Sequence, residues 1–318
     1  MRQESVCQLL AAPVARALLN CALDMEKLQE IRLRAGRPML VRYSGQEFAV
    51  CLSGKLSANA ADGYCVTEED LKETLEYVSG YSLYAFDEEV RQGFLTVPGG
   101  HRVGLAGHAV MEGGQVRSLR HISSLNIRLS HQVRGCADPL LPWLYEKEEV
   151  CSTLLLSPPG GGKTTLLRDL IRQVSDGGRY GAGQTVGVVD ERSELAGSYL
   201  GVPQNDLGMR TDVLDGCRKP EGMRMLLRSM SPEVIAVDEL GNETDGEAIE
   251  HAFTCGCRLL ATVHSASMEE GKRKPFLQKL LRAKAFERYV VLAGRGKPGM
   301  VREICDQDGA VLYKENAQ

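Results

Sequence analysis

No apolar run in this sequence approaches the roughly 20 residues that a membrane-spanning helix needs. Met1 to Asp24 holds no basic segment followed by a long apolar core, so we expect a first helix there and not a secretory signal. Internal repeats, coiled-coil heptads and long low-complexity tracts are also missing. These absences favour an ordinary globular protein with a cytoplasmic location.

Aromatic residues are scarce, and neither sign of charge dominates. Aromatics make up 5% of the chain, and the formal net charge is −4. Such a chain offers few rings on which bases could stack and no overall attraction to nucleic acid or to anionic lipid. A nucleic acid partner is therefore disfavoured. Arg32, Arg34 and Arg37 form a basic patch, which keeps a nucleic-acid-dependent motor open as an alternative.

The ten cysteines are scattered along the chain. Cys255 and Cys257 are the close pair, but paired zinc ligands usually have two residues between them and a second pair elsewhere. In a chain of this size we expect reduced, buried thiols, as in the cytosol, and no metal site at these cysteines.

With 318 residues, of which 43% are hydrophobic and 25% charged, the chain suits two domains that each bury a core. Residues 1–135 mix helix and strand patterns and are expected to form a smaller N-terminal α+β domain. Residues 131–150 contain two prolines, a glycine and a short amphipathic piece, which predict a domain boundary there with a linker at 136–150. Residues 151–318 form the second domain.

The second domain alternates two kinds of pattern. Strands are expected at 152–156, 186–190, 233–238, 258–263 and 289–292, and helices at 163–176, 221–230, 244–255 and 273–285. This alternation predicts an α/β fold with a mostly parallel sheet and helices on both faces.

Between the first of these strands and its helix lies Ser157-Pro158-Pro159-Gly160-Gly161-Gly162-Lys163-Thr164-Thr165. Glycines let the backbone curl closely around phosphate oxygens, and the helix start adds free N–H groups and a positive dipole. Lys163 is expected to reach the β- and γ-phosphates of ATP, and Thr164 to ligate Mg²⁺. We assign this whole stretch to nucleotide binding, although Ser157 replaces the glycine that usually opens the motif.

A second apolar strand pattern ends in Asp238 and Glu239. In folds with a phosphate-binding loop, such a strand brings its carboxylate to the Mg²⁺ beside the loop. Asp238 is therefore the expected metal-side ligand, acting through water. Glu239 is placed to polarise the attacking water as a general base.

Two more strand patterns end in polar residues. Asp190 and Glu191 follow one of them, and Thr262 and His264 lie at the end of the other. Ligands of open parallel sheets bind outside the carboxyl ends of the strands. We expect all four strand ends to share one edge, and His264 to sense the γ-phosphate.

Together these residues resemble the secretion ATPases, the hexameric motors of type II and type IV secretion and of pilus retraction. Asp190-Glu191 matches their acidic box, and Cys255 to Ala266 looks like their histidine box. Leu227–Glu233 is similar to the segment before their second acidic motif. Similarity to their N-terminal domain appears at Glu30–Pro38, Phe94–Val103 and Ser118–Ser123. Asp238 departs from the family, which usually has glycine there.

The resemblance implies a RecA-like P-loop NTPase domain, a homo-hexamer and partners in a membrane channel or secretion complex. Arg102 and Arg120 match N-terminal-domain arginines that point at the nucleotide, although a solvated sheet face would equally explain them. The family's acidic-box glutamate can match Asp190 or Glu191, so both are candidates for that catalytic role. The amino-acid sequences of two segments, Glu30–Pro38 and Val189–Glu194, look closest to a sporulation branch of the family.

The leading hypothesis is thus a Mg²⁺-dependent ATPase that converts ATP hydrolysis into domain motion at the cytosolic face of a membrane complex. A nucleic-acid-dependent motor is the second hypothesis. A scaffold that binds ATP and scarcely hydrolyses it is the third, because Ser157 departs from the usual motif and the acidic box is ambiguous.

Overall fold

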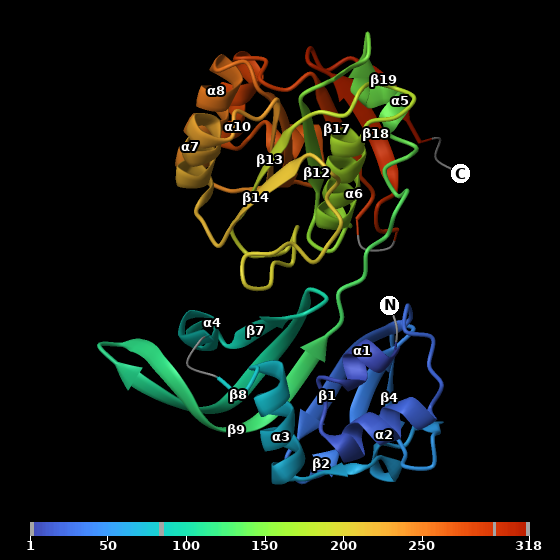
Figure 1. Ribbon diagram of the computed structural model, residues 1–318. Helices are drawn as coiled ribbons and strands as arrows, with labels where there is room; N and C mark the ends of the chain where they lie inside the picture. Colours follow the sequence, from blue (N-terminus) through green and yellow to red (C-terminus); the bar gives the residue numbers. More distant parts are fainter. Residues whose placement is uncertain (1–2, 83–85, 295–296, 316–318) are drawn as a thin grey trace. The chain divides into compact units, whose positions relative to one another are not determined.

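The computed structural model describes residues 3–82, 86–294 and 297–315. The chain divides into two compact units, Met1–His131 and Gln132–Gln318. Each unit has its own β-sheet and its own helices (Figure 1). Within the described residues, no helix has the length and apolarity that a bilayer crossing requires.

The first unit is built on an antiparallel sheet. Its strand order is β5-β4-β3-β1-β9-β8-β7. The strands are β1 (Leu28–Arg34), β3 (Leu40–Tyr43), β4 (Gln46–Val50), β5 (Leu56–Ser57), β7 (Phe94–Val97), β8 (His101–Glu112) and β9 (Gln115–Arg128), while β2 (Arg37–Pro38) pairs with β6 (Cys65–Val66). This sheet and its helices are the α+β arrangement that the sequence predicts for the N-terminal region.

Short helices and a 3₁₀ turn complete the described part of the first unit. They are α1 (Gln3–Cys7), α2 (Ala12–Asn20), η1 (Ala60–Asp62), α3 (Glu68–Val78) and α4 (Asp87–Gln92). The single helix expected over 1–24 is two helices, because Pro13 lacks the N–H of a helix interior and sits in the first turn of α2. Thr67 caps α3, since Thr67 and Asp70 form a reciprocal capping box.

The second unit contains the mostly parallel sheet that the alternation predicts. Its strand order is β14-β13-β15-β16-β12-β17-β18-β19. The strands are β12 (Thr153–Ser157), β13 (Val186–Asp190), β14 (Thr211–Asp215), β15 (Val234–Leu240), β16 (Arg258–His264), β17 (Arg288–Leu292), β18 (Val301–Asp306) and β19 (Val311–Lys314). The last two strands add an antiparallel edge, and β10 (Tyr145–Glu146) pairs with β11 (Glu149–Val150) as a separate hairpin.

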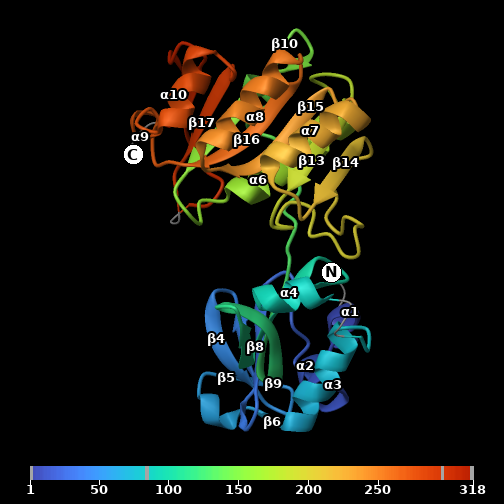
Figure 2. The same cartoon turned by 90° about the vertical axis from the view of Figure 1, so that its left-hand side faces the viewer.

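Helices cover both faces of this sheet, as expected for an α/β fold. They are α5 (Leu141–Leu144), α6 (Lys163–Asp176), α7 (Lys219–Ser229), α8 (Glu243–Thr254), α9 (Met268–Gly271) and α10 (Pro275–Arg282). Figure 2 shows α7, α8 and α10 on one face, with α6 on the other. Along β15, Ile235 and Val237 belong to the core under α7 and α8, while Val234 and Ala236 belong to the core under α6. A strand with both faces buried reads as a continuous apolar run for this reason.

Residues 136–150, expected to be a linker, pack into the second unit. Ala137, Leu140 and Leu144 are almost completely buried and belong to the core under α6. The backbone N–H of Ala137 donates to the buried carboxylate of Asp169 on α6 at 2.9 Å. The composition of this segment is typical of a loop and therefore did not predict that its apolar side chains belong to the core.

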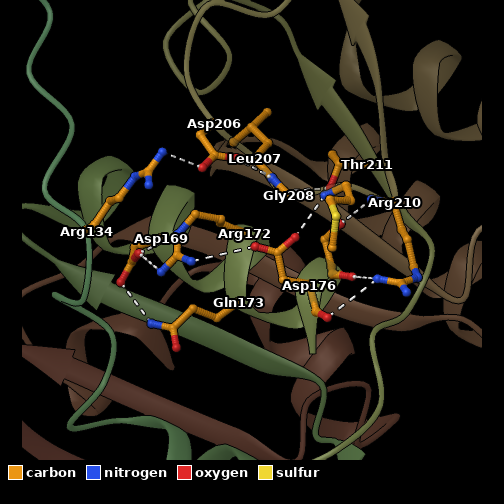
Figure 3. A network of polar contacts seen from close by, with 12 residues as sticks. Arg134, Asp169, Arg172, Gln173, Asp176, Asp206, Leu207, Gly208, Arg210 and Thr211 are labelled. Atoms are coloured by element: carbon orange, nitrogen blue, oxygen red, sulfur yellow. Dashed lines mark hydrogen bonds and ion pairs between the residues drawn. The ribbon is translucent and has the colours of Figure 1, made fainter. Parts of the chain in front are cut away.

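Polar contacts on and around α6 involve residues from three segments: the start of the second unit, α6 itself and the loop before β14 (Figure 3). Asp169 accepts hydrogen bonds from Arg172 at 2.7 Å, and Arg172 lies 3.7 Å from Asp176 in turn. Arg134 pairs with Asp206 at 2.7 Å. The start of the second unit and the loop before β14 are therefore both anchored next to the helix that begins at the glycine-rich loop.

Candidate functional site

The glycine-rich turn between β12 and α6 admits no larger residue at its centre. Gly160 and Gly162 have left-handed backbones, with φ of +75° and +88°. A Cβ on Gly162 would lie 2.7 Å from the backbone nitrogen of Gly299, and one on Gly161 would lie 1.9 Å from Ser157 Oγ. The backbone therefore curls tightly in front of the α6 N-terminus, where its N–H groups and the helix dipole favour an anion.

Ser157 fits where the usual motif has glycine. Its φ is not positive, so a side chain is tolerated there. The side chain is fully buried, and its hydroxyl donates to the Pro158 carbonyl oxygen at 2.9 Å. The serine therefore closes the turn with a local hydrogen bond.

Lys163, the first residue of α6, is 4% exposed. Its Nζ donates to the Ser157 carbonyl oxygen at 3.3 Å and to His264 Nδ1 at 3.0 Å. Burial lowers the pKa of Lys163, and the carboxylates of Asp238 and Glu239 oppose that shift. The ammonium is thus held inside the curl of the loop, where an anion would meet it.

Thr164 and Asp238 lie together, as the sequence predicts for a shared metal. Thr164 Oγ1 donates to Asp238 Oδ2 at 2.6 Å. Asp238 Oδ1 accepts from the Thr262 hydroxyl and from the backbone N–H of Glu239. The carboxylate is therefore oriented by two elements, its own strand β15 and the neighbouring strand β16.

Glu239 is turned out of its strand by an irregularity. The register of β15 against β16 shifts between Val237 and Leu240, and Glu239 has a φ of +55°, which non-glycine residues seldom adopt. Its Oε1 lies 2.9 Å from His264 Nε2, and its Oε2 accepts from Arg192 Nη1 at 2.7 Å. Such local strain is typical of functional positions.

His264 connects the lysine to the glutamate. A protonated Lys163 can only donate, so His264 Nδ1 is the acceptor of that contact. The remaining ring nitrogen, Nε2, then carries the hydrogen and donates to Glu239. The neutral Nε2–H form of the imidazole satisfies both contacts.

The acidic pair at the end of β13, Asp190 and Glu191, makes its contacts with the following loop and with α7. Asp190 is 2% exposed, and its oxygens accept backbone N–H bonds from residues 194, 195 and 196 at 2.8–3.0 Å. Glu191 pairs with Lys219 at 2.5 Å. Across the part of the chain that the structure describes, neither carboxylate hydrogen-bonds to Lys163 or Glu239. Asp190 thus shapes the loop that follows β13, and a direct catalytic role for either acid stays a prediction.

The buried Asp190 also predicts a pH dependence of stability. Burial raises its pKa to about 6 from 3.8, despite the backbone N–H bonds that favour the charged form. The folded protein therefore keeps this proton to a higher pH than the unfolded chain, and the free energy of unfolding falls as pH rises from about 4 to about 6. We expect Asp190→Asn to remove up to about 1.4 kcal/mol per pH unit of that slope. Urea unfolding at pH 4 to 7 measures it, and parallel curves for both proteins would contradict it.

The predicted arginines lie in the first unit. Arg102 on β8 packs its guanidinium 4.8 Å from the ring centroid of Phe94, and Arg120 is an exposed residue of β9. Their role at a nucleotide stays a prediction, since it requires a first unit to meet a second unit of the same or another copy. Arg32, part of the basic patch considered for nucleic acid, donates two hydrogen bonds to Glu30 at 2.7 and 2.9 Å.

Three site residues were not assigned a role from the sequence. Thr262 orients Asp238 and accepts from the N–H of Glu239 at 2.9 Å. Thr262 and His264 are two residues apart on one strand, so their side chains share a face, and this spacing could have predicted a place for Thr262 in the site. Arg168 is buried, and donates to the carbonyls of Glu194 and Leu195. Arg192 contacts Glu239, and its sequence position after two acids gave no indication of that.

The strand order brings the predicted strand ends together. β13, β15, β16 and β12 are consecutive neighbours and mutually parallel. Their carboxyl ends carry Asp190, Asp238 with Glu239, His264 and the glycine-rich loop. Polar groups on four adjacent strands thus meet at one edge, as the sequence predicts.

This fold and site define a P-loop α/β protein with the fold of secretion ATPases. Solved structures that share the fold include the ATPase DotB of Legionella pneumophila (TM-score 0.54, 15% identity, 84% of this chain and 72% of that chain) and the pilus retraction motor PilT with bound ADP (TM-score 0.52, 14% identity, 87% of this chain and 76% of that chain).

The particular family follows from the sequence comparison. The family model described as "Sporulation stage III, protein AA" matches residues 1–312, and the chain belongs to this family. It is 42% identical over 288 residues to stage III sporulation protein AA of Bacillus subtilis (strain 168), covering 91% of this chain and 90% of that protein. The resemblance to a sporulation family is thereby confirmed.

Proposed function

We propose that this protein hydrolyses ATP to ADP and phosphate. The observation that supports this most is the meeting of five side chains in front of the curled loop: Lys163, the Thr164–Asp238 pair, and Glu239 held by His264. In phosphoryl transfer, catalysis consists almost entirely of positioning and charge stabilisation, and these are the group types that provide both.

The residues fit a triphosphate and its Mg²⁺. The curl at Gly161 and Gly162 has no room for a Cβ, which suits close approach by phosphate oxygens. Thr164 and Asp238 present a hydroxyl and a carboxylate, both hard oxygen donors, 2.6 Å apart. No cluster of three or more His, Cys, Asp or Glu exists among the described residues to hold an ion by itself. Mg²⁺ in nucleotide sites usually keeps waters and phosphate oxygens among its ligands, so one hydroxyl and one carboxylate are sufficient protein groups.

Each side chain then has a defined task. Lys163 binds phosphate oxygens, and Thr164 with Asp238 would hold Mg²⁺, which neutralises phosphate charge when bound. Glu239 takes the proton of the attacking water as general base. His264, hydrogen-bonded to both Lys163 and Glu239, couples the phosphate-binding residue to the base.

We further propose that the protein works as a ring-forming motor at the cytosolic face of a membrane channel or secretion complex. Membership of the sporulation family and the fold shared with the DotB ATPase and the pilus retraction motor support this. Arg102 or Arg120 would complete the site of a neighbouring copy. The proposal needs no nucleic acid.

Phosphate release from ATP tests the activity. We expect turnover by the full chain with Mg²⁺ and none above background when EDTA removes the metal, because the phosphate charge is then not neutralised. Restoring Mg²⁺ should restore turnover. If ATP binds, measured by isothermal titration, but no phosphate is released with Mg²⁺, the protein is a nucleotide-dependent scaffold. A rise of turnover with added DNA that disappears at high salt would instead support the nucleic-acid motor.

A further inference from the structure

Arg192 reaches the proposed base from the loop after β13. Its Nη1 donates to Glu239 Oε2 at 2.7 Å. The Arg192 side chain is 66% exposed and that of Glu239 is 25% exposed. An ion pair at such a surface contributes little to stability, about 0–1 kcal/mol, so stability alone gives a weak reason for this contact.

The loop that carries Arg192 is anchored on both sides of it. The buried carboxylate of Asp190 accepts three backbone N–H bonds from residues 194–196. Arg168 of α6 donates to the carbonyls of residues 194 and 195, and Ser193 Oγ donates to Asp215 at 2.7 Å. The Arg192 side chain is long and exposed, but the backbone that carries it is fixed. The guanidinium therefore starts from a defined position beside Glu239.

Each oxygen of the Glu239 carboxylate has its own hydrogen-bond partner. Oε1 faces His264 on β16, and Oε2 faces Arg192 on the β13 loop. A glutamate side chain has several rotatable bonds and would otherwise sample many positions. Two donors from two different elements, one on each oxygen, restrict the carboxylate to one place.

We propose that Arg192 is a positioning residue that aims Glu239 at the attacking water. This rests on the proposed ATP hydrolysis, with Glu239 as its base. Arg192 acts through Glu239 and does not contact the nucleotide. Proton transfer requires the base within hydrogen-bond reach of the water, so misplacing it slows the chemical step without weakening ATP binding.

Steady-state kinetics of the full chain tests the inference. We expect Arg192→Ala to lower kcat by about tenfold, a part of the roughly 10²–10⁴-fold that general base catalysis contributes, with KM within about twofold. Arg192→Lys should recover part of kcat, because an ammonium still donates to Oε2 but lacks the fixed fork of the guanidinium. Arg228→Ala, at an exposed arginine of α7, is the matched control and should leave kcat unchanged.

A double-mutant cycle separates positioning from a general structural role. In a Glu239→Gln background, Arg192→Ala should have no further effect on kcat, because the base that it positions is gone. A second readout needs no nucleotide. The ¹⁵N signals of the Arg192 guanidinium, identified by their loss in Arg192→Lys, should show hindered rotation that disappears in Glu239→Ala.

Each remaining outcome has a definite meaning. An unchanged or increased kcat in Arg192→Ala overturns the inference and leaves the proposed function standing, provided that wild type hydrolyses ATP. A rise in KM with unchanged kcat shows a direct nucleotide contact and also overturns it. No Mg²⁺-dependent turnover by wild type overturns the inference together with the proposed function.

Discussion

Glu239→Gln is expected to reduce kcat for ATP hydrolysis by about 10²- to 10⁴-fold while ATP still binds. Glutamine keeps the size of the side chain, but its single carbonyl oxygen can replace only one of the two oxygens that accept from His264 and Arg192. What it loses is the ability to take a proton from water. Phosphate release and fluorescent-nucleotide titration measure the two quantities separately, and the affinity for ATP should stay within about threefold because Lys163 is unaffected.

The matched control for this variant is Glu250→Gln, an exposed glutamate of α8. It should have the kcat of wild type. If Glu239→Gln also retained the kcat of wild type, Glu239 would not be the base, and the two acids at the end of β13, Asp190 and Glu191, would become the candidates.

Lys163→Ala is expected to weaken ATP binding and to abolish detectable turnover. A charge-assisted hydrogen bond contributes about 1.5–3 kcal/mol, so we expect the Kd for ATP to rise roughly 10- to 100-fold. The lysine also neutralises charge that develops on the transferring phosphoryl group, so kcat falls further than the loss of binding alone would predict. Isothermal titration gives Kd, and phosphate release at saturating ATP gives kcat.

Loss of the fold is not the expected cause of this defect. Lys163 is a buried cation whose pKa is lowered by that burial, so replacing it removes a desolvation cost. The midpoint of thermal unfolding should be equal to that of wild type or higher. Lys272→Ala, at an exposed lysine, is the control for both measurements. Equal Kd in Lys163→Ala and wild type would show that ATP does not bind at the glycine-rich loop.

Some features of the site could be predicted because they are local. Ser157 to Thr165 combine a buried strand, glycines and an amphipathic helix, and that pattern directly reports a tight turn before a helix start. Asp238 and Glu239 end an apolar strand, and the carboxyl ends of parallel strands share an edge. The sequence therefore predicted the loop, the acids and His264 as neighbours, and the structure has Lys163, Thr164, Asp238, Glu239 and His264 in hydrogen-bond contact.

Other features depend on contacts between distant segments. The helical pattern places Arg168 and Asp169 on the polar side of α6, yet both are buried. Arg168 is covered by the loop after β13, whose carbonyls it binds, and Asp169 by the segment at Ala137. Side-chain periodicity reports which face of a helix a residue occupies, but not which remote polar segment packs there.

The sequence by itself determined the α/β class, the glycine-rich loop and the identity of the acids, since these depend on neighbours a few residues away. Only the tertiary structure decided that Asp190 anchors a loop, that residues 136–150 belong to the second unit, and that Arg192 meets Glu239. The physical reason is that a buried carboxylate or an exposed arginine has its role set by the donors and acceptors that non-local packing brings within about 3 Å.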